Sequence, residues 1–151
     1  MRIAMFQPDI AGNVGTVLRL GACMGVGVDL IEPMGFPWSD RALARAGMDY
    51  AAQASVVRHV DWEAFHAALP GRLVLLTTRG AVPLPQARFE PGDTLLLGSE
   101  GSGVPAEVRA AADLAVAIPM RPAMRSLNVA VSAALVLGEA LRQTHGWPTG
   151  A

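Results

Sequence analysis

The chain of 151 residues lacks several features that would each assign it to a functional class. It has a single cysteine, Cys23, so it cannot form an internal disulfide, and its 3 histidines are scattered without the spacing of a metal site. No stretch approaches the roughly 18 apolar residues that a membrane span needs. The opening run MRIAMFQPDI is cut by Pro8 and is too short for a signal peptide. We therefore expect a cytoplasmic protein that binds no metal.

Lysine is also absent, so all 12 basic residues are arginine, and the formal net charge is −1. A nearly neutral charge argues weakly against a nucleic-acid-binding protein. A genome rich in G and C would favour arginine over lysine without any functional cause, and we favour this explanation. Arginine nevertheless suits phosphate well, because its planar guanidinium donates two parallel hydrogen bonds. The positions of the arginines therefore carry more information than their number.

What the chain does contain is typical of one compact domain, which we expect to span residues 1–151. Apolar residues make up 52% of it and charged residues 17%, enough material for a core. The pattern predicts strands over residues 3–7, 28–32, 56–60, 72–78, 93–99 and 114–120. It predicts helices over 14–24, from an Asp40 cap to a stop at Gly47, from an Asp61 cap to Pro70, and over 126–144. This alternation indicates an α/β fold with a mainly parallel sheet and helices on both faces.

In such folds ligands bind at the carboxyl ends of the strands. Three polar or glycine-rich segments follow predicted strands there, over residues 8–13, 98–105 and 119–128. None carries the G-x-G-x-x-G of a dinucleotide site, a phosphate-binding G-K-[ST] loop or the G-x-S-x-G of a serine hydrolase. Hydride transfer, nucleotide hydrolysis and serine hydrolysis therefore lose support.

The middle segment, LLLGSEGSGVP, holds Glu100 among glycines that let the backbone turn sharply and approach a ligand. A glycine-rich turn without any ligand explains this loop alone about equally well. In the last segment, Ser126 is a helix-cap candidate, and Asn128 indicates either capping or a hydrogen-bonding task. In the first, Asn13 is most simply a cap, whereas an unpaired Arg19 in an otherwise apolar helix would be costly.

The helix that follows Asn128 is apolar nearly all round, so it must be buried on more than one side. In so small a domain, a subunit interface is a natural way to bury it. We therefore expect a homodimer.

Together the three segments resemble the three motifs of SPOUT-class RNA 2′-O-methyltransferases. They match an N-x-x-G followed by arginine, a G-x-E-x-x-G loop, and an I-P-M…S-L-N entry to the last helix. The segments IEPMGFPW (31–38), RALARAGMDY (41–50), RHVDWEAF (58–65), LTTRG (76–80) and GEALRQ (138–143) resemble the TrmL branch of that class. Its members are minimal enzymes that modify the ribose of the wobble nucleotide in certain leucine tRNAs. The resemblance covers nearly the whole chain in order.

The resemblance implies an α/β fold with a deep trefoil knot near the C-terminus, an exception to the rule that chains do not thread their loops. It implies S-adenosylmethionine as cofactor, tRNA (its anticodon stem-loop) as partner, and a homodimer. Cofactor contacts are expected from Leu76, Thr77, Thr78, Gly98, Gly103, Ile118, Met120, Ser126 and Leu127. Catalytic roles are expected for Asn13, Arg19, Glu100, Arg125, Ser126 and Asn128. Weaker candidates for the tRNA surface are Arg41, Arg45 and Arg121.

Two alternatives stay open. One is a SPOUT methyltransferase for another tRNA position or for ribosomal RNA. The other is a nucleotide- or RNA-binding protein that has lost catalysis, although the candidate catalytic residues are all present. The chain also departs from the resemblance, because Ser102 stands where the class often has arginine, and Thr16 replaces the second asparagine of an N-x-G-N form.

Overall fold

The structure, a computed structural model, describes residues 1–45, 53–79 and 81–150. Its centre is a seven-stranded sheet in the order β3-β2-β1-β6-β4-β7-β5, in which every pairing is parallel. The strands are β1 (Arg2–Phe6), β2 (Gly27–Ile31), β3 (Val56–His59), β4 (Leu73–Leu76), β5 (Val82–Pro83), β6 (Thr94–Leu97) and β7 (Leu114–Ala117). The predicted α/β fold with a parallel sheet is therefore confirmed.

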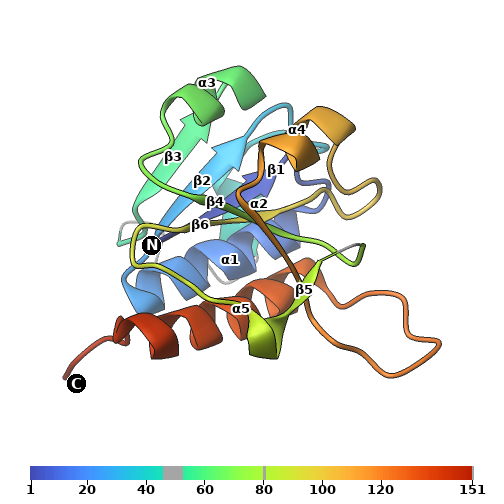
Figure 1. Ribbon diagram of the computed structural model, residues 1–151. Helices are drawn as coiled ribbons and strands as arrows, with labels where there is room; N and C mark the ends of the chain where they lie inside the picture. The colour runs from blue at the N-terminus through green and yellow to red at the C-terminus, as the bar shows by residue number, and fades with distance from the viewer. Residues whose placement is uncertain (46–52, 80, 151) are drawn as a thin grey trace.

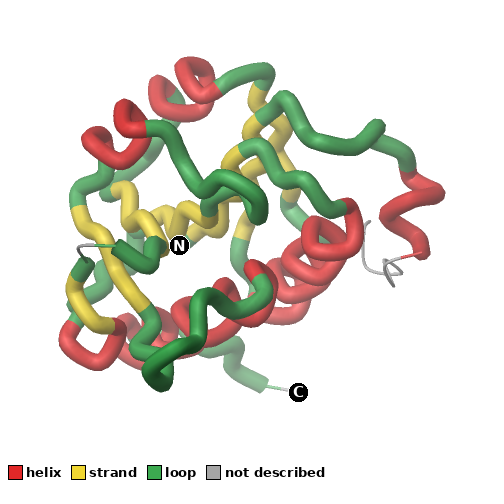
Figure 2. The backbone as a smooth tube through the Cα atoms, turned by 90° about the vertical axis from the view of Figure 1, so that its right-hand side faces the viewer, coloured by secondary structure: helices red, strands yellow, loops and turns green. Residues whose placement is uncertain are grey.

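Helices cover both faces of this sheet (Figure 1). On one face, α1 (Ala11–Met24) packs against α2 (Asp40–Arg45) and the long α5 (Val129–Thr144). The short helices α3 (Trp62–Ala67) and α4 (Ala106–Ala111) lie on the other face, and a 3-10 turn, η1 (Leu84–Gln86), follows β5. Figure 2 shows the strands between these two helical layers. Two hydrophobic cores result, one on each face of the sheet.

The central strands are almost entirely apolar after their first residue because both of their faces are covered. All four residues of β6 are buried, and its side chains alternate between the two cores: Leu95 and Leu97 contact the α1 and α5 side, and Leu96 the α3 side. The continuous apolar runs of the sequence thus identified the middle of the sheet correctly.

Helix starts were predicted less well than the strands. The Asp61 cap of α3 is confirmed, since its carboxylate accepts a hydrogen bond from the Ala64 N–H. The cap of α2 is Ser39, whose hydroxyl accepts from the Ala42 N–H, so the prediction of Asp40 was wrong by one residue. The predicted helix stop at Gly47 lies outside the described residues.

The last helix also begins later than predicted. Its N-cap is Asn128, whose side-chain oxygen accepts from the N–H groups of Ala130 and Val131. Ser126 therefore does not cap the helix and stays in the preceding loop. The knot implied by the resemblance remains a prediction. Among the described residues, no helix is long and apolar enough to cross a membrane.

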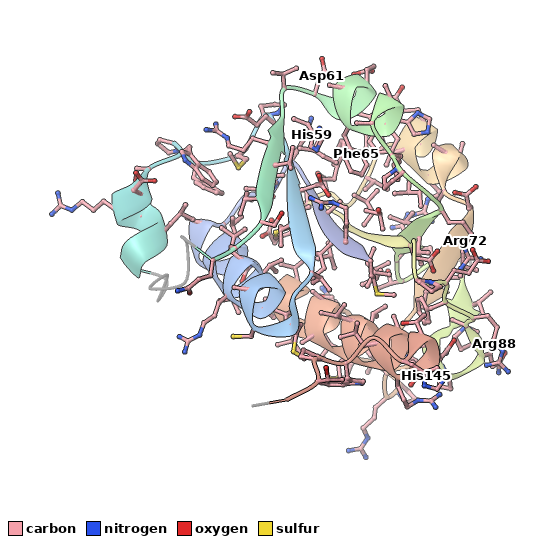
Figure 3. The ribbon with its side chains drawn as sticks, turned by 90° about the vertical axis from the view of Figure 1, so that its left-hand side faces the viewer. His59, Asp61, Phe65, Arg72, Arg88 and His145 are labelled. Carbon is pink, nitrogen blue, oxygen red and sulfur yellow. The ribbon has the colours of Figure 1, made fainter. Side chains whose placement is uncertain are left out.

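A buried ion pair joins the amino ends of the central strands. Asp93, at the start of β6, is 0% exposed and accepts two hydrogen bonds of 2.9 Å from the Arg72 guanidinium beside β4. It accepts a third from the Glu90 N–H, while Arg72 also donates to the Arg88 carbonyl. The hydrogen bond with Asp93 raises the pKa of Arg72 above its usual value. Figure 3 shows Arg72 and Arg88 on neighbouring segments near the end of α5.

Replacing Arg72 with alanine should destabilise the fold, because it leaves the Asp93 carboxylate buried without its counter-charge. Breaking one side of a buried ion pair costs about 3 kcal/mol or more. Urea unfolding of Arg72→Ala should show this loss. Arg142→Ala is the matched control, because it removes the exposed pair with Glu139 and should leave the unfolding midpoint nearly unchanged. Equal losses of unfolding free energy in the two variants would contradict the conclusion that burial makes the Arg72–Asp93 pair the more important one.

Candidate functional site

A cavity of about 640 Å³ opens at the carboxyl ends of β4, β6 and β7. Three loops that follow parallel strands meet there with the first turns of α1 and α5. Because all strands are parallel, their carboxyl ends share one edge of the sheet, where α/β proteins bind ligands. The size suits a nucleotide-sized molecule. The long loop between β7 and α5 extends outward beside this edge (Figure 1).

The cavity gathers most of the residues that the sequence singled out. All nine residues expected to contact a cofactor line it: Leu76, Thr77, Thr78, Gly98, Gly103, Ile118, Met120, Ser126 and Leu127. Four of the six expected catalytic residues do as well: Asn13, Glu100, Ser126 and Asn128. The structure therefore brings these residues together, while the roles assigned to them stay predictions.

The loop after β6 is shaped by two glycines. Ser99 and Gly103 exchange two backbone hydrogen bonds of 3.0 and 2.8 Å, which close the loop into a tight ring. A Cβ at Gly98 would lie 2.8 Å from both the Cα and the carbonyl carbon of Gly103. Gly103 itself has φ of 67°, a backbone conformation that side chains disfavour. Glycine at position 98 thus lets the two sides of the loop approach each other, and glycine at position 103 allows the left-handed backbone that closes it.

A chain of hydrogen bonds links the three loops at the mouth of the cavity. The Glu100 carboxylate accepts from the Asn13 amide at 3.1 Å, and the Asn13 side-chain oxygen accepts from the Asn128 amide at 3.0 Å. Asn128 in turn caps α5. Asn128 is therefore both a helix cap and a link between distant segments, so both explanations drawn from the sequence apply to it. Asn13 lies inside the first turn of α1, whose N-cap is Ile10, so the prediction that Asn13 is a cap was wrong.

The two remaining catalytic candidates lie outside the cavity lining. Arg19 is exposed on α1, so its charge is not enclosed by the apolar residues that surround it in the sequence. The apolar residues around it in sequence point elsewhere, because the buried side of α1 is formed by Val14, Val17 and Leu18. Arg125 is exposed on the loop before α5.

The structure places two of the three candidates for the tRNA surface. Arg41 and Arg121 are exposed, whereas the side chain of Arg45 lies outside the described part of the chain.

Besides Arg79, which lines the cavity, sequence reasoning missed Arg109 and Asp9 as charged residues of the site. Arg109 on α4 lines the cavity and donates to the Thr77 hydroxyl at 3.2 Å and the Arg79 carbonyl at 3.4 Å. Asp9 accepts from the Ser99 hydroxyl and the Gly101 N–H. The hydrogen bond from Ser99, followed by that from Gly101, holds the pKa of Asp9 below its usual value. The sequence carries no signal for either residue, because their partners are far away in the chain.

The walls of the cavity combine apolar side chains with exposed backbone of the glycine loop. Leu76, Ile118 and Leu127 supply apolar surface, and the loop around Gly98 leaves no room for a Cβ. Such a lining suits a flat, partly apolar ligand that is recognised through backbone groups. Within residues 1–45, 53–79 and 81–150, no cluster of three or more potential metal ligands is found.

Parallel α/β topology and a cavity built from a glycine ring and the cap of the last helix define the class of SPOUT-like α/β proteins. A family model, the SpoU rRNA Methylase family, matches residues 1–138. The chain therefore belongs to the SpoU rRNA Methylase family.

Relatives with an assigned activity resemble the chain over nearly its whole length. It is 56% identical to a tRNA (cytidine(34)-2′-O)-methyltransferase of Beijerinckia indica subsp. indica, over 93% of this chain and 90% of the relative. The enzyme of the same description from Escherichia coli K12 is 40% identical, over 98% and 96% of the two chains.

Solved structures agree with this family. One that concerns 2-OH methylation of C/U34 on tRNA superposes with a TM-score of 0.89 at 40% identity, covering 94% of each chain. An AdoMet-bound rRNA methyltransferase from Sinorhizobium meliloti has a TM-score of 0.84 at 27% identity, covering 93% of this chain and 55% of that one.

Gly98→Ala should damage the cavity without unfolding the sheet, because the added Cβ would collide with the Gly103 backbone and force the loop open. We expect loss of S-adenosylmethionine binding in isothermal titration, while the far-ultraviolet circular dichroism stays unchanged. Gly92→Ala is the control, since a Cβ there meets nothing within 4 Å. Normal cofactor binding by Gly98→Ala would contradict a rigid loop.

Proposed function

We propose that this protein is a tRNA (cytidine/uridine-2′-O)-methyltransferase that uses S-adenosylmethionine to methylate the ribose of the wobble nucleotide in leucine tRNAs. The observation that carries the proposal is the Glu100–Asn13–Asn128 hydrogen-bond chain at the mouth of a glycine-lined cavity. The relatives described above act on cytidine 34 of tRNA, which supports the choice of substrate. Residues 1–151 form one SPOUT domain in this proposal, working in the cytoplasm where tRNA is found.

The cavity fits S-adenosylmethionine on chemical grounds. Its backbone-lined glycine loop can bind the adenine edge, and the apolar side chains of Leu76, Ile118 and Leu127 can cover the ring. When bound, this cofactor supplies a methyl group activated by a positively charged sulfur. The chain itself must then hold a ribose 2′-hydroxyl in line with the methyl group and stabilise the oxygen as its proton leaves.

The mouth of the cavity offers side chains for both tasks. Ser126 and Asn128 line the cavity and can contact the hydroxyl, and Glu100 orients Asn13 toward Asn128. An arginine keeps its proton in proteins, so Arg19 acts here as an electrostatic partner of a neighbouring phosphate and of the developing alkoxide, not as a base. The exposed Arg125 provides a second phosphate or ribose contact.

A homodimer is part of the proposal. Val131 and Leu135 are four residues apart, so they share one side of α5, and they are 48% and 47% exposed. Leu127, in the loop just before the helix, is 40% exposed. The opposite side of α5 is buried in the chain's own core. Because Leu127 also lines the cavity, a second copy packed on this face would close one edge of the site.

Another member of the same enzyme class, acting on a different tRNA position or on ribosomal RNA, is the alternative. The family model itself bears the name of an rRNA methylase, which is the observation in its favour.

Methyl transfer from labelled S-adenosylmethionine to bulk tRNA, with nucleoside analysis of the product, tests the proposal. We expect 2′-O-methylcytidine or 2′-O-methyluridine, mapped by fragments to the wobble position of leucine tRNAs. Arg19→Ala should lower turnover about 10²- to 10³-fold, the usual effect of removing one electrostatic donor. It should still bind the cofactor, because Arg19 does not line the cavity. Product at another position favours the alternative, and unchanged turnover of Arg19→Ala refutes its role.

Leu135→Glu should convert the dimer to a monomer, because it places a charge in the apolar face of α5. Sedimentation velocity at micromolar concentration measures this change. Val60→Glu is the matched control, since Val60 is 74% exposed between β3 and α3 and should leave the dimer intact. A wild-type protein that sediments as a monomer would overturn the dimer proposal.

A further inference from the structure

Asp9 makes a reciprocal contact with the glycine loop from the carboxyl end of the neighbouring strand β1. Its Oδ2 accepts from the Ser99 hydroxyl at 2.6 Å and from the Gly101 N–H at 3.1 Å. Its own backbone N–H donates to Glu100 Oε2 at 2.7 Å. Three consecutive residues of the loop are therefore bound to one residue of the β1–α1 connection.

The contact with Asp9 holds the outer side of the glycine loop in place. The backbone of Ser99 is already engaged with Gly103, which fixes the inner side of the ring. Ser99 is almost fully buried. Among the described residues, the one hydrogen-bond neighbour of its hydroxyl apart from Asp9 is the Ser102 hydroxyl, at the long distance of 3.5 Å. Removing the Asp9 carboxylate therefore leaves a buried hydroxyl poorly satisfied and the Gly101 amide without that acceptor.

Gly35, in the loop after β2, leaves room for the Asp9 carboxylate. A Cβ at Gly35 would lie 2.9 Å from Asp9 Oδ1 and 3.0 Å from its Cα, so only glycine allows this approach. The Gly35 N–H also donates to the Pro8 carbonyl at 2.9 Å, which holds the β2–α2 loop against Asp9. Asp9 thus sits where three connections meet.

Glu100 connects the Asp9 contact to the proposed site. Glu100, held by the Asp9 backbone through one carboxylate oxygen, uses the other to hold Asn13, which holds Asn128. On the other side, Gly98 and Gly103 of the same loop line the cavity. A shift of the loop would therefore move the cofactor wall and the Glu100–Asn13–Asn128 chain together.

We propose that Asp9 is a positioning residue that fixes the glycine loop and Glu100 in the geometry needed for cofactor binding and methyl transfer. The inference rests on the function proposed above for this cavity. Asp9 touches neither reactant and acts through Ser99, Glu100 and Gly101.

The structure makes a conservative rescue possible. Both side-chain hydrogen bonds end on the same oxygen, Oδ2, so Asp9→Asn can keep both with its amide oxygen, whereas Asp9→Ala keeps neither. We expect Asp9→Ala to bind S-adenosylmethionine about tenfold more weakly, in line with the loss of one or two hydrogen bonds. At saturating cofactor and tRNA, its kcat should fall by a similar factor. Asp9→Asn should stay within about threefold of the wild type in both.

Hydrogen exchange of the protein without cofactor gives a readout that needs no activity. The Gly101 and Gly103 amides should exchange faster in Asp9→Ala than in the wild type and in Asp9→Asn. Asp61→Ala is the matched control, because it removes an aspartate cap whose partner is the Ala64 N–H on α3, and no residue of that helix lines the cavity. It should lower the melting temperature but leave cofactor affinity and loop exchange unchanged.

Two results would overturn the inference. Asp9→Ala with wild-type cofactor affinity and loop exchange would show that the contact positions nothing. Asp9→Asn as impaired as Asp9→Ala would show that charge, and not hydrogen bonding, is what matters at this position. If the wild-type protein bound no S-adenosylmethionine, the proposed function would fail, and the exchange of the Gly101 amide would still decide whether Asp9 fixes the loop.

Discussion

Glu100 carries the contact on which the geometry of the site depends. It lies in the tight loop after β6, and its two carboxylate oxygens accept hydrogen bonds from the Asp9 N–H in the β1–α1 connection and from the Asn13 amide in the first turn of α1. Parallel strands bring their carboxyl ends to one edge of the sheet, but they do not by themselves fix how the loops beyond that edge sit. The carboxylate supplies this missing constraint. Through Asn13 it also reaches Asn128 and hence the start of α5.

The same hydrogen bonds accommodate two neighbouring carboxylates at the site, those of Asp9 and Glu100. Asp9 and Glu100 are engaged in hydrogen bonds on the loops, which makes two neighbouring carboxylates tolerable near a place where RNA phosphates would approach. Arg79 and Arg109 line the cavity, whereas the exposed Arg19 and Arg125 lie outside its lining, on α1 and on the loop before α5. With a net charge of only −1 and no lysine, attraction for RNA must be local. The placement of the arginines, more than the total charge of the chain, therefore supports the proposed tRNA substrate.

The last helix joins the fold to the proposed assembly. One side of α5 fills the core beneath the sheet, and the other keeps Val131 and Leu135 about half exposed. A small domain has too little surface of its own to cover every side of such a helix. The site and the proposed interface share Leu127, so assembly and ligand binding would be coupled through this short stretch of chain.

By itself, the sequence determined the elements whose signal is local. Continuous apolar runs located β4, β6 and β7, and glycines with Glu100 located the loop that lines the cavity, because backbone shape depends on neighbouring residues. The resemblance added the cavity residues that no periodicity could assign. Only the tertiary structure decided the rest: that Arg19 is exposed, that Asn128 and not Ser126 caps α5, and that Asp9 and Arg109 belong to the site. The reason is that these properties depend on partners distant in the chain, with Asp9 and Ser99 separated by 90 positions and Asn13 and Asn128 by 115, and no local pattern encodes such pairings.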